Sequence, residues 1–354
     1  MALSVPKLVT GWIYCIREED YLDGTIGRFV KLGLTARTVP IRIREHQTAN
    51  PRKEYSEYDI LLEMMDYAET YLHHHFAQDR IAGEWFDMDN ARVLAEVAPI
   101  LQTLQAEMAI EKSNFVGWAA LKSTASNGTV ISPTPAISAL HQLYQIADES
   151  HTLAEAQHKI HDNNLRALVG TNNGIEGVLI LQENNKSDAF QKAVFATLIT
   201  AAQLAQCEET KTTFKGTLSV ESGRNLATLD PALDAQLTAS ASSITISPNI
   251  TNLANAEVTL TQSIKDEHMA WLGTLRQVKE AEWECYKLKA QIVVALGANQ
   301  GITNIVTWRR YSDTKTAFST KKAKELFEAE YNSSFAPVQN TVSVKMNRGR
   351  KYNP

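Results

Sequence analysis

The stretch GWIYCI, residues 11–16, is a short apolar run with one tyrosine, Tyr14, inside it. A second run, RFVKLGL at residues 28–34, follows after the turn sequence LDGT. β-Branched and aromatic residues that flank an Asp-Gly turn are typical of a β-hairpin. The sequence therefore predicts that the chain opens with two paired strands, one carrying Tyr14 and the other Lys31.

Two helices and a closing strand are predicted after this hairpin. Pro40 is suited to the first turn of a helix, and the segment PIRIREHQTANP predicts a helix that runs until Pro51. A second helix is expected in YAETYLHHHF, and Gly83 is expected to break it. Trp85 and Phe86 then follow as expected core residues of a small closing strand. About the first 90 residues are expected to form one small unit with its own sheet.

Composition limits the class of protein. The chain has 354 residues, of which 44% are hydrophobic and 21% charged, enough for two or three globular domains. A net charge of −5 means that any site for a polyanion has to be local. The three cysteines form no CxxC pair, which favours a reducing, cytoplasmic location. We find no run of about 18 apolar residues and no signal peptide, so we expect no membrane span.

The remainder of the chain predicts long helices and mixed segments. An amphipathic helix is expected over residues 90–111, with Val93, Leu94, Val97, Leu101, Leu104 and Met108 on its apolar side and a kink at Pro99. Residues 123–135, rich in Ser, Thr, Gly and Pro, are expected to be a linker. Residues 263–296 predict a long helix that ends at Gly297 and packs within the chain or pairs with a second copy.

These patterns predict an α+β, multi-domain protein. The expected divisions are residues 1–96, 97–135 (helix and linker), 136–262 (a mixed region of unknown role) and 263–354 (long helix and basic tail module).

Four motifs together resemble the GIY-YIG nuclease superfamily. They are WIY at 12–14, KLG at 31–33, IRIREH on the first predicted helix, and AETYLHHHFAQDRIAGEWF at 68–86. The likeness is to the short branch common in phages and mobile elements, in which the second motif usually reads KIG and the domain closes on GEWF. The resemblance covers about residues 10–90. It implies a small antiparallel sheet flanked by helices and metal-dependent hydrolysis of phosphodiester bonds in DNA.

The resemblance gives four residues a chemical role. Tyr14 would contact the attacking water. Lys31, which stands where the second motif usually has tyrosine, would help to deprotonate that water. Arg42 would hold the scissile phosphate, and Glu69 would bind a single Mg²⁺ or Mn²⁺ through carboxylate oxygen.

Further residues of the same segment complete the expected site. His46 follows Arg42 by four residues, so that both lie on one helix face, and His73 also matches a family position. The register leaves Arg44 and Arg37 as alternatives to Arg42, and both are expected to contact nucleic acid.

Zinc is a second interpretation of the triplet His73, His74 and His75. Adjacent histidines point to different faces of a helix, and no Cys or HExxH partner accompanies them. The sequence therefore favours His73 at the phosphate site, or in support of Glu69. Glu84, in GEWF, is expected to stabilise the fold and not to bind metal.

The last quarter of the chain resembles, more weakly, the tail that follows the catalytic core in some phage recombination exonucleases. Residues 305–354 hold ten Lys or Arg against four Asp or Glu. Trp308, Tyr311 and Tyr352 are interleaved with the basic residues, a pattern typical of nucleic-acid binding. The residues expected to contact DNA here are Arg309, Arg310, Arg348 and Arg350. An oligomerisation module is the alternative.

The sequence as a whole predicts a cytoplasmic, Mg²⁺- or Mn²⁺-dependent DNA endonuclease. Its C-terminal modules would bind DNA or assemble the protein, and the helix at 263–296 is a possible homo-oligomer contact. The alternative is an inactive DNA-binding or assembly protein, because the second motif lacks its tyrosine.

Overall fold

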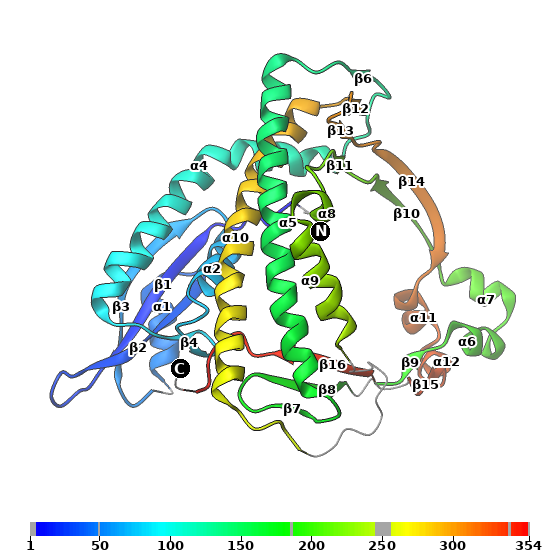
Figure 1. The fold of residues 1–354 in the computed structure, drawn as a ribbon. Helices are drawn as coiled ribbons and strands as arrows, with labels where there is room; N and C mark the ends of the chain where they lie inside the picture. The colour runs from blue at the N-terminus through cyan, green and yellow to red at the C-terminus, as the bar shows by residue number, and fades with distance from the viewer. Residues whose placement is uncertain (1–4, 49, 185–186, 245–255, 339–340, 353–354) are drawn as a thin grey trace.

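The computed structural model describes residues 5–48, 50–184, 187–244, 256–338 and 341–352. The fold is mixed α+β, as predicted, with several small sheets arranged around two long helices (Figure 1). The long helices are α5 (Pro135–Val169) and α10 (Gln262–Leu296).

A five-stranded antiparallel sheet forms the N-terminal unit, in the order β3-β1-β2-β5-β4. Its first two strands form the predicted hairpin, and Tyr14 lies opposite Gly33. Helices α1 and α2 flank the sheet. The elements are β1 (Gly11–Glu19), β2 (Ile26–Thr35), α1 (Val39–Gln47), β3 (Lys53–Leu62), α2 (Met65–His75), β4 (Arg80–Ala82) and β5 (Trp85–Asp87).

Strand β3 was not predicted, and the helix before it is shorter than expected. Helix α1 ends at Gln47, whose side-chain amide donates to the carbonyl oxygens of Asn50 at 3.1 Å and Arg52 at 2.7 Å. The second of these bonds spans Pro51. A residue that precedes proline is disfavoured in a helix, so the helix ends before Asn50. The charged residues of β3 hide its strand pattern, although Ile60 is buried. Of the two expected core aromatics, Phe86 is fully buried and Trp85 only partly.

One continuous helical segment runs from Asn90 to Leu121. It comprises α3 (Asn90–Arg92), the π-helical η1 (Val93–Val97) and α4 (Ala98–Leu121). The wider π-helical turn stands just before Pro99, which has no N–H to donate to the preceding turn. The predicted apolar side is buried except for Leu94, which is 54% exposed, because the π-helical turn shifts the register.

By length and composition alone, this segment could also cross a membrane. The indication is weak, because core helices of soluble proteins meet the same criterion. Its apolar side packs in the main core of the chain.

Helix α10 is the central packing element, since it contacts α2, α4 and α5. Leu275, Cys285, Ile292 and Leu296 on its predicted apolar stripe are buried within the chain. Val278, Ala281 and Leu288 of the same stripe are only partly buried, and pairing with a second copy stays a prediction. Gly297, at φ +57°, ends the helix as predicted, in a backbone conformation that favours glycine.

Segment 123–135 is built into a sheet and is not a free linker. Its strand β6 pairs with β12 in a four-stranded sheet of order β11-β13-β12-β6. A three-stranded sheet of order β16-β8-β7 lies at the other end of the long helices (Figure 1). The strands are β6 (Val130–Ile131), β7 (Gly174–Ile175), β8 (Leu179–Asn184), β11 (Ser219–Val220), β12 (Gly301–Ile302), β13 (Val306–Thr307) and β16 (Thr341–Met346).

A two-stranded ribbon, β10 with β14, extends away from the helices and carries a small helical tip (Figure 1). The tip has its own apolar cluster, which is centred on Phe195. The remaining elements are β9 (Ala189–Phe190), α6 (Lys192–Leu198), α7 (Ala201–Gln206), β10 (Glu208–Lys215), α8 (Leu226–Leu229), α9 (Pro231–Ser242), β14 (Tyr311–Phe318), α11 (Thr320–Leu326), α12 (Glu328–Asn332) and β15 (Phe335–Ala336).

A single hydrophobic cluster joins segments that the sequence assigned to different modules. It includes Ile13 of β1, Leu104 of α4, Trp283 of α10 and Trp308, which follows β13. The N-terminal sheet, the α4 helix and the last quarter of the chain therefore share one core. The division into four domains stays a prediction.

Candidate active site

Tyr14 is fixed by the centre of the N-terminal sheet. The tyrosine is fully buried, and its ring lies against Gly33 on the neighbouring strand. A Cβ atom at position 33 would stand 2.6 Å from the Tyr14 hydroxyl oxygen. The glycine of the KLG motif is thus required by the close approach of the phenol ring, and the two motifs form one unit.

Replacing Gly33 with alanine is expected to lower the free energy of unfolding by about 1–3 kcal/mol, because the added methyl group overpacks a filled site. Chemical denaturation measures the loss. A double-mutant cycle with Tyr14→Ala provides the control, since removal of the ring should abolish most of the cost of the methyl group. Additive effects of the two substitutions would contradict the proposed contact.

Three polar side chains form a connected cluster at Tyr14: two of them contact its hydroxyl, and the third contacts His46. Arg42 Nε donates to the Tyr14 hydroxyl oxygen at 3.4 Å, and His46 Nε2 lies 3.5 Å from the same oxygen. Lys31 Nζ donates to His46 Nε2 at 3.1 Å. Arg42 and His46 are four residues apart on α1, so one helix face presents both to the sheet.

The protonation states of these groups follow from burial and from the nearby cations. Burial raises the pKa of the Tyr14 phenol, and the hydrogen bond from Arg42 opposes this shift in part. Burial, followed by the charges of Lys31 and Arg42, lowers the pKa of His46. Near neutral pH the cluster therefore holds a neutral phenol and a neutral imidazole beside two cations.

Glu69 stands close to this cluster without a partner of its own. In the part of the chain that the structure describes, its carboxylate has no hydrogen bond or ion pair. Burial raises the pKa of Glu69 from 4.5 to about 7, and the negative charges of Glu84 and Asp66 add to the increase. Lys31 and Arg80 act in the opposite direction, which places both within electrostatic reach of the carboxylate.

The carboxylate of Glu69 offers the oxygen donors that suit a hard divalent cation. An unpartnered, half-buried carboxylate is the ligand that Mg²⁺ or Mn²⁺ prefers. Within the described residues, no group of three or more His, Cys, Asp and Glu side chains could hold a metal ion.

The three consecutive histidines make different contacts. His73 Nε2 lies 2.9 Å from the Leu32 carbonyl oxygen, and burial lowers the pKa of this ring to about 4. His73 thus ties α2 to β2, whereas the sequence placed it at the phosphate or beside Glu69. His74 lines a cleft on one side of α2, and His75 pairs with Glu280 at 3.2 Å.

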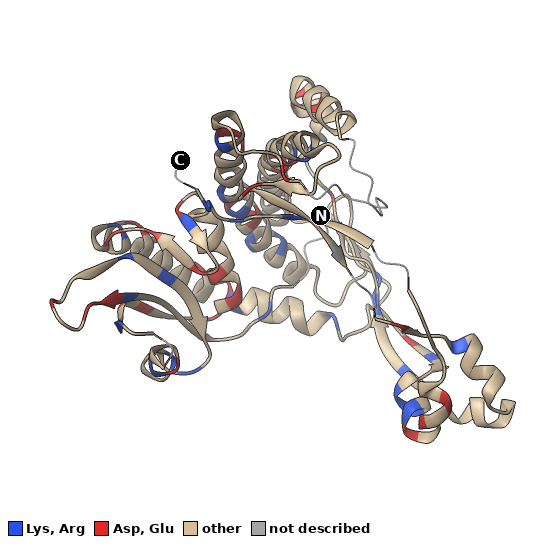
Figure 2. Ribbon diagram, turned by 90° about the horizontal axis from the view of Figure 1, so that it is seen from below, with Lys and Arg blue, Asp and Glu red and all other residues tan. Residues whose placement is uncertain are grey.

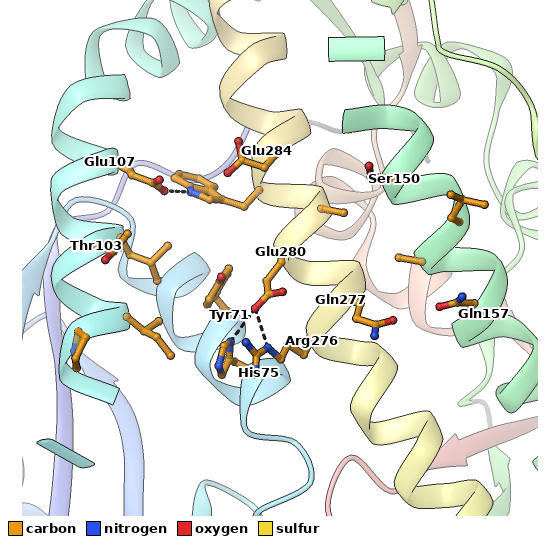
Figure 3. A pocket seen from close by; sticks show the side chains of 17 residues that line it. Tyr71, His75, Thr103, Glu107, Ser150, Gln157, Arg276, Gln277, Glu280 and Glu284 are labelled. Carbon is orange, nitrogen blue, oxygen red and sulfur yellow. Dashed lines mark hydrogen bonds and ion pairs between the residues drawn. The ribbon is translucent and has the colours of Figure 1, made fainter. Parts of the chain in front are cut away.

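His75 and Tyr71 face a separate cavity of about 790 Å³ between α2, α4, α5 and α10 (Figure 3). Figure 3 shows Glu280 between His75 and Arg276 at its lower end. Glu69 precedes Tyr71 by two residues, and side chains two residues apart on a helix point about 200° apart. This cavity is therefore on the face of α2 opposite to Glu69.

Of the three candidate arginines, only Arg42 joins the cluster. Arg37 pairs with Glu45 at 2.5 Å on the exposed side of α1. Arg44 is exposed, and its side chain has no hydrogen bond or ion pair among the described residues. Arg42 also contacts Glu45, at 3.2 Å, while its Nε reaches Tyr14.

Two residues of the closing motif belong to the site, although the sequence gave them no chemical role. Glu84 forms an ion pair with Lys31 at 3.4 Å. Arg80 donates to the Gly83 carbonyl oxygen at 2.5 Å and lies over the Phe86 ring. The spacing R…GEWF in the sequence could have pointed to both residues. The direction of their side chains, however, depends on the β4–β5 turn.

The C-terminal arginines separate into buried and exposed ones. Arg310 is only 2% exposed and donates to the Gly297 carbonyl oxygen at 2.7 Å, so it caps α10 and the prediction of a DNA contact is wrong for this residue. Trp308, 4% exposed, likewise cannot stack on a base. Arg350 pairs with Asp87 at 2.8 Å. Arg309 and Arg348 are exposed and stay predicted DNA contacts.

Comparison of the chain with protein-family models, curated proteins and solved structures finds no match. The GIY-YIG resemblance therefore rests on the residues of the motifs.

Proposed function

We propose that this protein is a metal-dependent DNA endonuclease of the GIY-YIG type, in keeping with its motifs. One observation carries the proposal: Tyr14, Lys31, Arg42 and His46 form a connected polar cluster beside the unpartnered carboxylate of Glu69. Hydrolysis of a phosphodiester needs groups that position water, accept a proton and stabilise charge on the phosphate. This cluster supplies each of them.

The roles of the side chains follow from their protonation and contacts. Arg42 offers guanidinium N–H groups to a phosphate oxygen, a geometry that arginine suits. His46, which is neutral, is the candidate general base for the attacking water, and the buried Tyr14 hydroxyl holds His46 and Arg42 in position. Lys31, which is ion-paired with Glu84, is better suited to stabilise negative charge than to accept a proton.

Glu69 would hold the cation. When bound there, Mg²⁺ or Mn²⁺ would neutralise charge on a phosphate oxygen and on the leaving oxygen.

Incubation of the purified protein with supercoiled plasmid tests the proposal. With Mg²⁺ or Mn²⁺ we expect nicked and linear products, and with EDTA we expect none. Absence of cleavage under all of these conditions would favour the alternative of an inactive DNA-binding or assembly protein.

His46→Ala is expected to slow cleavage about a hundredfold near neutral pH, since a positioned general base contributes at least this much. The deficit should shrink as pH rises, because hydroxide replaces the missing base. Single-turnover rates across pH measure this effect. His75→Ala is the matched control, because His75 faces the separate cavity and its loss should leave the rate unchanged.

Lys31→Met distinguishes between two roles of that lysine, stabilising negative charge and accepting a proton from the attacking water. If Lys31 stabilises charge, the variant should be slower by a constant factor at every pH. A deficit that shrinks with rising pH would instead assign the general base to Lys31.

A further inference from the structure

A second cleft begins at the candidate active site. Its cavity of about 900 Å³ is enclosed by α2, the β4–β5 turn, α5, β8, β16 and the segment that follows β16. Arg80 lines this cleft and also lowers the pKa of Glu69. Thr70, which follows Glu69 on α2, also lines the cleft, so the cleft begins beside the candidate active site.

The cleft is positively charged, in contrast to the chain as a whole. Five basic and two acidic side chains line it among the described residues. Arg166 is neutralised by Asp162 at 2.6 Å. Figure 2 shows Lys and Arg, in blue, on the segment beside the C-terminus. The basic residues are Arg80, Arg166, Lys345, Arg348 and Lys351, and the acidic ones are Asp162 and Glu257.

Three cations of β16 and its continuation, unlike Arg350, are not paired with another described residue. Lys345, Arg348 and Lys351 are exposed, and none of them forms a hydrogen bond or ion pair with another described residue. They are spaced three residues apart along one segment. A row of uncompensated cations along a cleft is a surface suited to a chain of phosphates.

The segment that carries these cations is held firmly against the N-terminal unit. Arg350 pairs with Asp87, and its backbone N–H donates to the Arg80 carbonyl oxygen at 2.7 Å. Gly349 allows this approach, because a Cβ atom there would stand 2.7 Å from the same oxygen. On the other side, Asn347 donates its backbone N–H to the Val178 carbonyl oxygen at 2.8 Å. Arg348 is therefore positioned by bonded neighbours on both sides.

We propose that this cleft binds the phosphate backbone of the DNA that continues from the scissile phosphate, through Lys345, Arg348 and Lys351. The inference rests on the proposed endonuclease function. Arg80 connects the two regions at the junction. His74, on the α2 wall, has a buried Nε2 without a partner among the described residues, and its neutral ring can hydrogen-bond to a phosphate oxygen.

The test compares two charge-matched double variants of the full chain. Lys345→Ala/Arg348→Ala removes two cleft cations, and Lys321→Ala/Lys324→Ala removes two exposed cations of α11 on the remote tip. Binding of a fluorescent DNA duplex is measured by anisotropy in EDTA, which prevents metal-dependent cleavage, over a range of salt concentrations. Thermal denaturation confirms that both variants are folded.

We expect the cleft variant to flatten the dependence of log affinity on log salt by about 2, since each lost phosphate contact accounts for about 0.9. The α11 variant should keep the wild-type slope. With Mg²⁺, the cleft variant should raise KM for cleavage and leave kcat at saturating DNA unchanged.

Failure of this inference can be told apart from failure of the proposed function. If the wild type cleaves DNA and the cleft variant keeps the wild-type slope, the cleft assignment is overturned and the endonuclease stands. Equal flattening in both variants also overturns the cleft assignment, because general charge then explains binding. If the cleft variant alone flattens the slope but the wild type never cleaves, the cleft stands as a DNA site and the endonuclease does not.

Discussion

Replacement of Glu69 by glutamine is expected to lower the rate of metal-dependent DNA cleavage about a thousandfold while the fold is retained. Glutamine keeps the shape of the side chain but removes the charge that binds the cation, and stabilisation of charge in the transition state is usually the largest catalytic effect. Single-turnover cleavage at saturating DNA measures the loss. Glu63→Gln is the matched control, since Glu63 pairs with Lys112 outside the cluster and its loss should leave the rate within about twofold.

The same variant tests cation binding without a cleavage assay. Because the pKa of Glu69 is raised to about 7 in the folded protein, the folded state favours the neutral carboxyl. This preference stabilises the folded protein below pH 4.5, the pKa of Glu69 in the unfolded state. The stabilisation is lost as pH rises through about 7. In EDTA, the Tm of Glu69→Gln relative to wild type should therefore increase from pH 5 to pH 7 and stay constant from pH 8 to pH 9.

Mg²⁺ should then raise the Tm of the wild type at pH 8.5 and leave that of Glu69→Gln unchanged, because only the carboxylate binds the cation. Full cleavage activity in Glu69→Gln, or equal stabilisation of both proteins by Mg²⁺, would exclude Glu69 as the metal ligand.

Arg42→Ala is expected to reduce kcat for cleavage by about a thousandfold, because the lost guanidinium contacts the phosphate as charge develops on it. Arg44→Ala supplies a control of identical chemistry on the same helix. Its side chain is exposed, without a partner among the described residues, so its loss should change the rate by less than about twofold. Quantitative plasmid cleavage by the three proteins measures both effects.

Arg42→Lys extends this comparison. Lysine keeps the charge but not the planar set of donors, so we expect only partial recovery of the rate. An active Arg42→Ala together with an inactive Arg44→Ala would assign the phosphate contact to Arg44, two residues further along α1, and would show that the choice of Arg42 is wrong.

Local patterns in the sequence were sufficient for several elements. The Asp-Gly turn between two apolar runs predicts the hairpin β1–β2, and Pro40 and Gly297 mark a helix start and a helix end. Such signals depend on the conformations that a few neighbouring residues can adopt, so they can be recognised without knowledge of the rest of the fold. Strand β3 escaped prediction because its charged residues interrupt the apolar alternation, and its pairing with β1 is a distant contact.

The sequence by itself determined which residue types are available for chemistry, namely the phenol of Tyr14, the arginines of α1 and the carboxylate of Glu69. Only the tertiary structure decided which of them meet. It placed Arg42 on Tyr14 and left Arg44 in solvent, and it buried Arg310 against the end of α10. The physical reason is that the direction and burial of a side chain depend on elements far away in the sequence. These elements set its solvation, its neighbours and hence its charge.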